Sequence, residues 1–458
     1  MSTLADRQRV EIQRCFDAFD SQFREWHARV EKPQWAMHYT QVHAATALLN
    51  GFRESIRVEG AEALDEVEGL VLSAWRVWEA FRSRLSQRQE EMFVAGLQAA
   101  DEIAWACRKP MVEAFAEAKK TMPVEPPLTC LHGSTSPTAL VRRIPFSGEG
   151  VESAFPSEYS RRLLQALPFP IISLPWHELF HAPGMVAVAH ETGHVVERDC
   201  GLEEAVWAAI QPVTPPEAQE RWKKWRAEIF ADFYAMRHCG AAFAGALADL
   251  LLTFIDSTPA DSYPPFRLRI ELCLAALELA SLPAEAATIR DHWKMNSGPA
   301  ANTAERQTAA AVVKALDLMP VTKDKTLGQI LPFGPEQHEA MLGIKKYLSR
   351  FDAEDQIGDP PATSIAAAAW LLFRDDPAHF ADEAQTDEIH HLILRVAGPQ
   401  GRRGTHSLAR VRRRAAQDQK SSVFQRQQSK AGFDLARSLL EEARQRVKKT
   451  SSRRKRRA

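Results

Sequence analysis

The chain has 458 residues, of which 45% are hydrophobic and 26% charged, and its net charge is −1. This length predicts two or three folded units, and the balanced composition excludes a disordered or fibrous protein. The N-terminus lacks the apolar core of a signal peptide, and the longest apolar run, Ile365 to Phe373, is too short to cross a bilayer. Six scattered cysteines without a CxxC pair fit reduced thiols. We therefore expect a cytoplasmic protein without membrane insertion.

Residues 1–122 are predicted to form an N-terminal helical bundle. Apolar side chains recur there at helical spacing, for example at Phe16, Phe19 and Phe23. The helical pattern then stops at the Pro126-Pro127 pair and the following Gly/Ser/Thr/Pro-rich stretch. A second domain is therefore expected from about residue 123.

Residues 123–332 are predicted to form a mixed domain that is rich in helix. Its expected strands are Ala139 to Phe146 and Ile171 to Leu174, and its expected helices are Val186 to Val196, Pro216 to Met236 and Phe266 to Leu279. The predicted fold class is mostly α with a small β-sheet, of the α+β type.

Two further regions follow. Residues 333–400 are predicted to be a C-terminal helical region, and residues 401–458 a basic tail, helical or disordered. From residue 401 onward, nineteen lysines and arginines face four acids, a charge of +15, which leaves −16 on the rest of the chain. This separation indicates a basic arm for an acidic partner, which includes nucleic acid and the acidic body of the chain itself.

The segment Val186 to Val196 contains the sequence His-Glu-Thr-Gly-His. Residues four apart share one face of a helix, so His190 and His194 can both offer imidazole nitrogen to one Zn²⁺. Glu191 lies about 100° round the helix and reaches beside the metal without binding it. Gly193 has no side chain and allows another helix to come close. The pattern predicts a zinc site with Glu191 as its catalytic base.

A second HExxH occurs at residues 177–181, only thirteen residues upstream. It lies between Pro175 and Pro183, which leave a single turn for the i, i+4 geometry. We interpret His177 and His181 as structural or surface residues, with a place in the wall of a cleft as the alternative.

A catalytic zinc usually has three protein ligands and one open position, so the third ligand must be found. A metzincin would carry Gly at 197 and His at 200, whereas this chain has Glu197 and Cys200. Further along, Glu228-Ile-Phe-Ala-Asp232 resembles the third-ligand helix of the gluzincin zinc peptidases. The resemblance implies that Glu228 binds zinc and that Asp232 orients a ligand histidine. The rival third ligand is Glu197, one turn beyond His194.

The block Tyr263-Pro-Pro-Phe-Arg-Leu-Arg-Ile270 is similar to the segment that follows this helix in the HtpX-like and CAAX-prenyl-peptidase clan of gluzincins. The resemblance covers roughly Ile171 to Leu282 and implies a zincin-like core flanked by helical domains. Tyr263 stands where the family pattern has His, and it could still donate a hydrogen bond. Arg269 could pair with Asp232 or meet the oxyanion.

Together these motifs predict a zinc metallopeptidase, a hydrolase that cleaves peptide bonds in a protein or peptide substrate through zinc-activated water, with Glu191 as the general base. Together with the zinc, Tyr263 or Arg269 is the expected donor to the oxyanion. Two other functions stay open: a non-catalytic zinc protein with a regulatory or interaction role, and a nucleic-acid-associated protein that acts through its basic tail.

Overall fold

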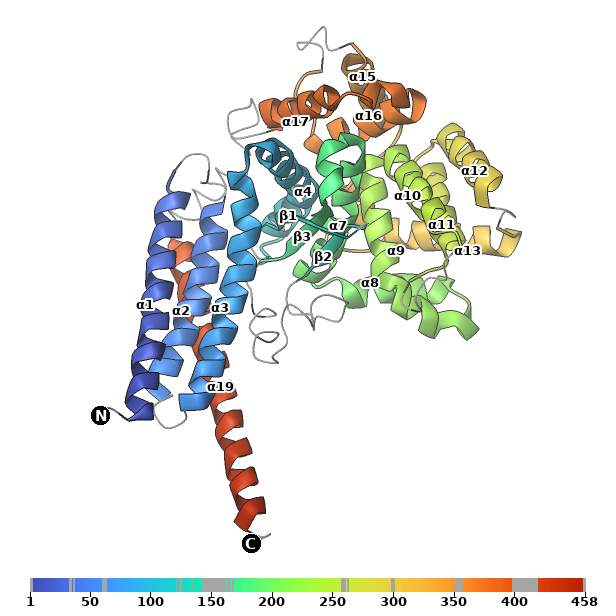
Figure 1. Cartoon of the computed structure of the whole chain (residues 1–458). Helices are drawn as coiled ribbons and strands as arrows, with labels where there is room; N and C mark the ends of the chain where they lie inside the picture. Colours follow the sequence, from blue (N-terminus) through green and yellow to red (C-terminus); the bar gives the residue numbers. More distant parts are fainter. Residues whose placement is uncertain are drawn as a thin grey trace. The chain divides into compact units, whose positions relative to one another are not determined.

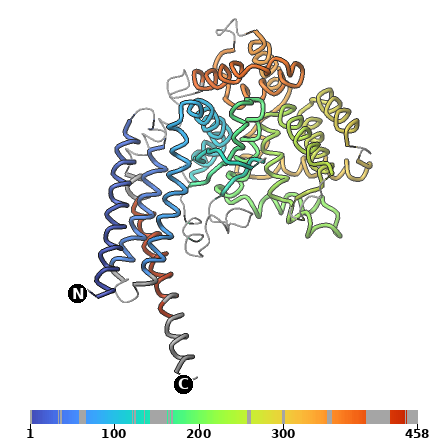
Figure 2. The backbone as a smooth tube through the Cα atoms, in the orientation of Figure 1, coloured from blue at the N-terminus to red at the C-terminus, as the bar shows by residue number. Residues whose placement is uncertain are grey.

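The computed structural model of the chain describes residues 3–32, 35, 38–59, 64–120, 122, 126–134, 136–141, 162, 166, 169–256, 261, 263–297, 301–350, 357–397 and 419–455. Figure 2 follows the backbone through them. The chain divides into two compact units. Unit 1 consists of Met1–Gln87, Arg142–Pro170 and Leu408–Ala458, and unit 2 of Arg88–Val141 and Ile171–Ser407. Each unit therefore joins segments that lie far apart in the sequence.

Unit 1 is a helical bundle (Figure 1). Its helices are α1 (Leu4–Val30), α2 (Tyr39–Glu59), α3 (Leu64–Ser86) and α19 (Gln419–Lys455). The predicted apolar stripe of α1 is buried, and Phe19 and Phe23 make edge-to-face contacts with Trp75 and Trp78 of α3. These aromatic pairs fix α1 against α3.

Helix α19 places much of the basic C-terminal segment inside this bundle. It packs along α2, where a Cβ atom at Gly51 would lie 1.7 Å from the carbonyl oxygen of Ser429. Leu439 and Leu440 of α19 are fully buried. The predicted tail is thus helical from Gln419 to Lys455, while residues 401–418 lie outside the described part of the chain. The domain boundaries proposed at 122, 332 and 400 stay predictions.

Unit 2 holds the sheet and the remaining α-helices of the described chain (Figure 1). They are α4 (Glu91–Glu117), β1 (Leu128–His132), β2 (Thr138–Leu140), β3 (Ile171–Pro175), α7 (Ala187–Asp199), α8 (Glu203–Ile210), α9 (Gln219–Cys239), α10 (Ala241–Thr253), α11 (Phe266–Leu279), α12 (Pro283–Ser297), α13 (Thr303–Asp317), α14 (Leu327–Ile330), α15 (Pro335–Leu348), α16 (Ala362–Asp375) and α17 (Glu383–Ala397).

The described sheet has three strands in the order β1-β3-β2. Strand β1 runs parallel to β3, with Leu128 opposite Ile171, and β2 runs antiparallel to β3, with Ala139 opposite Ile172. The predicted strand at Ile171 is confirmed. The one predicted from Ala139 to Phe146 is found as Thr138–Leu140, and residues 142–146 lie outside the described chain. The predicted class, mostly α with a small sheet, is confirmed.

The predicted helices of unit 2 are present with small shifts at their ends. Helix α11 has the predicted bounds, and α7 runs three residues beyond Val196. Helix α9 starts at Gln219 because Pro216–Ala218 forms a 3-10 turn before it. Among the described helices, none has both the length and the apolarity needed to cross a membrane.

Helix α7 is central to the core of unit 2. It packs against α4 and α9 and contacts β2 and β3. Its apolar residues Val188, Val195 and Val196 are fully buried in the main hydrophobic cluster of the unit. Burial on several sides holds this helix rigidly, which suits a helix that carries functional side chains.

Candidate metal centre

The HETGH sequence lies in the middle of α7, so its two histidines project from one face as the i, i+4 spacing predicts. Gly193 faces α9: a Cβ atom there would lie 2.8 Å from Cα of Ala231. Any side chain at this position would push the two helices apart. The glycine therefore sets the close approach that brings the glutamate of α9 within reach of the histidines.

Three side chains converge at this point. Nε2 of His190 and Nε2 of His194 are 3.2 Å apart, and the Glu228 carboxylate lies 3.5 Å from His190 and 3.3 Å from His194. A tetrahedral zinc with bonds of about 2.0–2.1 Å would place its ligand atoms about 3.3 Å apart. The triad thus has donor types and a spacing that could hold a metal ion, and in the described chain it is the one such group of three.

Asp232 and Arg269 contact the residues of the triad and each other. Oδ1 of Asp232 lies 2.9 Å from Nδ1 of His190, the ring nitrogen that faces away from the other ligands. The Arg269 guanidinium donates two hydrogen bonds to Asp232, at 2.6 and 2.8 Å, and its Nη2 lies 3.5 Å from Glu228. Both side chains are buried. Such a carboxylate fixes the tautomer and the orientation of a ligand histidine.

The electrostatics of this cluster favour a bound cation. Burial opposes ionisation of Glu228, but the charges and hydrogen bonds of His194 and His190, with Arg269, hold its pKa well below the usual range. Burial also disfavours a charged His190, yet Asp232 and Glu228 outweigh it and raise the pKa of the imidazole to about 10. Glu228 and Asp232 thus stabilise a positive charge on the His190 imidazole. The same negative charges would favour a metal cation bound by the imidazole in place of the proton.

Glu191 lies beside the triad without joining it. Its side chain is buried, with 6% of the residue exposed, and burial raises the pKa of its carboxyl despite the opposing charges of His190 and His194. A carboxylate whose pKa is raised toward neutrality is better suited to take up and release a proton. This is the position that the HExxH pattern predicts for a base.

Tyr263 is 45% exposed and lies just before α11. The negative charge of Glu228, burial and the charge of Glu191 raise the pKa of its phenol. The side chain therefore belongs to the electrostatic surroundings of the triad and keeps its proton at neutral pH.

The rival ligand Glu197 has a different partner. Its carboxylate accepts a hydrogen bond of 2.8 Å from Nε of Arg226 on α9, and it is not part of the triad. Cys200 lies at the end of α7, where its Sγ is 3.8 Å from the sulfur of Met122. Neither residue completes a metzincin-type ligand set.

The upstream HExxH does not form an equivalent site. Residues Trp176–Phe180 are a 3-10 helix, so the i, i+4 alignment of an α-helix is missing. His177 is exposed, whereas His181 packs against Phe373 with ring centroids 4.6 Å apart. Burial raises the pKa of Glu178 to about 7. The interpretation of this motif as structural agrees with these contacts.

The chain matches no protein-family model, no curated protein and no solved structure. The candidate metal centre is therefore defined by its side chains alone. What they establish is a His190, His194 and Glu228 group that could hold a metal ion.

Two supporting contacts were not predicted from the sequence. Arg108 of α4 and Asp199 at the end of α7 form a fully buried ion pair of 2.9 Å, which anchors the histidine helix. Phe243 of α10 stacks on the His190 ring, with centroids 5.9 Å apart. No local motif marks these residues, because each acts across a large gap in the sequence.

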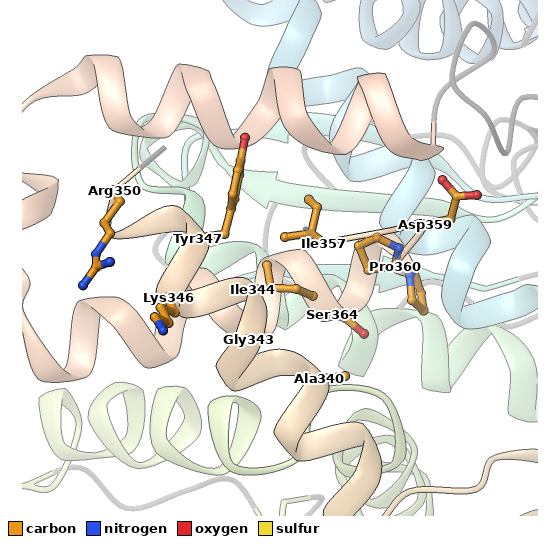
Figure 3. Close-up of a pocket in the computed structure, with 11 residues that line it drawn as sticks. Ala340, Gly343, Ile344, Lys346, Tyr347, Arg350, Ile357, Asp359, Pro360 and Ser364 are labelled. Atoms are coloured by element: carbon orange, nitrogen blue, oxygen red, sulfur yellow. The ribbon is translucent and has the colours of Figure 1, made fainter. Parts of the chain in front are cut away.

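A cavity of about 540 Å³ also occurs in unit 2, lined by α15, the first residues of α16 and the segment before it (Figure 3). Lys346, Tyr347 and Asp359 are among its lining residues. None of the metal-site residues borders it. We therefore do not assign this cavity to the chemistry of the triad.

We expect Asp232→Asn to weaken zinc binding by roughly 10–100-fold while the fold is kept. The substitution removes the charge that orients His190 and leaves Arg269 with a weaker partner. Zinc affinity can be measured by competition with a chromophoric chelator. Asp249→Asn, which changes an exposed carboxylate paired with His292, is the matched control and should leave the affinity unchanged. If Asp232→Asn bound zinc as tightly as wild type, Asp232 would not be needed to orient His190 for the metal.

Proposed function

We propose that unit 2 is a zinc-dependent endopeptidase of the gluzincin type. The observation that carries the proposal is Glu191, a buried carboxylate next to three potential ligands and not itself one of them. A purely structural zinc site is normally closed by four protein ligands and needs no base. His190, His194 and Glu228 would hold the zinc with three ligands, which would leave a fourth position for water.

The residues have separate roles in the proposed reaction. Zinc, when bound by His190, His194 and Glu228, would supply Lewis-acid chemistry and lower the pKa of water toward ~7. Glu191 takes a proton from the attacking water and returns it to the leaving amine. Tyr263 donates a hydrogen bond to the carbonyl oxygen as negative charge develops on it.

Arg269 acts in this scheme by positioning. Its guanidinium is buried and holds Asp232 through two hydrogen bonds, which favours the pairing role over direct contact with the oxyanion. A contact between its Nη2 and Glu228 extends this support to the third ligand.

The sheet suggests how an extended peptide would bind. Strand β3 is paired on both sides, whereas β2 pairs with β3 alone in the described sheet. Strand β2 also contacts α7. We propose that a substrate backbone pairs with the edge of β2 that has no partner among the described strands, which would give recognition with loose side-chain specificity.

Hydrolysis of an unfolded protein such as reduced casein tests the proposal. The purified chain is expected to cleave it, to lose this activity with a chelator and to regain it with one equivalent of zinc per chain. Zinc-loaded protein without hydrolysis of casein or of a peptide library would favour the alternative, a non-catalytic zinc protein with a regulatory or interaction role.

Tyr263→Phe is expected to lower kcat by roughly 10–100-fold, because a hydrogen bond to a charged oxygen contributes about 1.5–3 kcal/mol. KM and zinc content should change little, since the ring stays and no ligand is lost. Steady-state kinetics on a fluorogenic peptide, with Tyr347→Phe as the control, measure the effect. An unchanged kcat would remove Tyr263 from the mechanism.

The basic C-terminal segment supports a separate proposal, an acidic partner that includes nucleic acid. The support is its charge of +15 together with a helix that continues to Lys455. Binding to phosphates would weaken steeply with salt. The cytoplasmic location stays a prediction.

A further inference from the structure

Trp225 lies three residues before Glu228 on α9, and the proposed mechanism gives it no role. Its side chain is buried, with 8% of the residue exposed, and it packs edge-on against Trp222 with ring centroids 5.8 Å apart. Packing alone would explain the ring. It does not explain the hydrogen bond of 3.1 Å that the indole Nε1 donates to the carbonyl oxygen of Asp261.

Asp261 is two residues before Tyr263, and two residues of extended chain span at most about 7 Å. A hydrogen bond at Asp261 therefore restricts where the Tyr263 backbone can lie. Trp225 and Glu228 are at i, i+3 on one side of α9, so the restraint comes from the helix that carries the third metal ligand.

The chain after Tyr263 is restrained as well. Pro264 and Pro265 have fixed φ angles, and the carbonyl of Pro265 accepts the first hydrogen bond of α11, from the backbone of Arg269 at 3.1 Å. The Arg269 side chain then binds Asp232 on α9. The segment that carries Tyr263 is thus bound to α9 at both of its ends. The first contact is the hydrogen bond from Trp225 to Asp261, and the second is the hydrogen-bonded pair of Arg269 and Asp232.

We propose that Trp225 is a positioning residue, whose indole N–H, bound to the Asp261 carbonyl, restrains the backbone that carries Tyr263. This inference rests on the proposed function, because it concerns the residue that donates to the substrate carbonyl. Trp225 does not touch the reacting atoms. It acts through the Asp261 carbonyl, which limits the positions available to the phenol.

Four variants test the inference: Trp225→Phe, Tyr263→Phe, the double variant and Trp222→Phe. Trp225→Phe keeps an aromatic ring and removes the donor, and is expected to lower kcat about 5- to 20-fold with KM within twofold. Trp222→Phe, the matched control on the same helix, should change kcat less than about twofold. The double variant should have the same kcat as Tyr263→Phe, because the position of the ring at residue 263 no longer matters once its hydroxyl is gone.

Two results would overturn the inference. In the first, Trp225→Phe lowers kcat by the same factor in the Tyr263→Phe background as in wild type. In the second, Trp222→Phe lowers kcat as much as Trp225→Phe does. If Trp225→Phe does not fold, 3-benzothienylalanine at position 225 keeps the ring shape and replaces the N–H by sulfur, and the same comparison applies.

Hydrogen exchange separates this inference from the proposed function. Amide exchange in the peptide that contains Asp261 and Phe266 should be faster in Trp225→Phe than in wild type and unchanged in Trp222→Phe. This result needs no turnover. Unchanged exchange in Trp225→Phe would overturn the inference, whereas absent hydrolysis by the wild type with faster exchange in Trp225→Phe would count against the proposed function alone.

Discussion

Glu191→Gln is expected to keep its zinc and its fold and to lose peptide hydrolysis by roughly 10²–10⁴-fold, the range that a general base contributes. Glutamine has nearly the same shape as glutamate, so the buried position beside His190 stays filled. The amide cannot accept the proton of the attacking water. The loss should fall on kcat, because Glu191 is not a ligand and the substrate can still bind.

Glu178→Gln is the matched control for this experiment. Glu178 occupies the same place in the upstream HExxH, and its carboxyl is partly buried and has, like that of Glu191, a raised pKa. It lies outside the triad, so Glu178→Gln should hydrolyse peptide at the wild-type rate. Unchanged hydrolysis in Glu191→Gln, or an equal loss in Glu178→Gln, would exclude Glu191 as the base.

Removing a ligand is expected to have the largest effect on the metal. His190→Ala, His194→Ala and Glu228→Ala should each weaken zinc binding by more than the roughly 100-fold that loss of a supporting residue costs. Purified protein should then contain little zinc by mass spectrometry, and hydrolysis should fall with it. His177→Ala, from the exposed end of the upstream motif, should purify with the same zinc as wild type.

Glu228→Ala is the most informative of the three. Its carboxylate is the ligand that comes from a different helix, thirty-four positions after His194. Full zinc occupancy in this variant would contradict the triad while leaving the two histidines as ligands. Zinc loss in Glu197→Ala alone would identify the rival carboxylate instead.

The pair of histidines was predictable because an α-helix fixes the geometry of residues i and i+4 on its own. The third carboxylate was not fixed by any local rule. Its selection depended on a resemblance, and the physical reason it reaches the histidines is the close packing of Gly193 against Ala231. Gly193 predicts that another helix comes close, but nothing in the sequence identifies that helix as the one that contains Ala231.

Other features depend on partners that the sequence does not reveal. Strand β1 at Leu128 follows a Pro-Pro pair and is only five residues long, and it exists because β3 pairs with it. The charge of α19 predicts an arm for an acidic partner, with the chain itself as one possibility, but it does not identify α2 as the helix beside it. Its buried Leu439 and Leu440 become informative only once α2 is beside them.

Anomalous diffraction at the zinc edge, on crystals grown with one equivalent of zinc, tests the central claim most directly. The account predicts one strong peak per chain within about 2.0–2.2 Å of Nε2 of His190, Nε2 of His194 and a carboxylate oxygen of Glu228, with a fourth position that is not filled by the protein. A peak at Glu197 or at His177 and His181, or no peak at the triad, would contradict it.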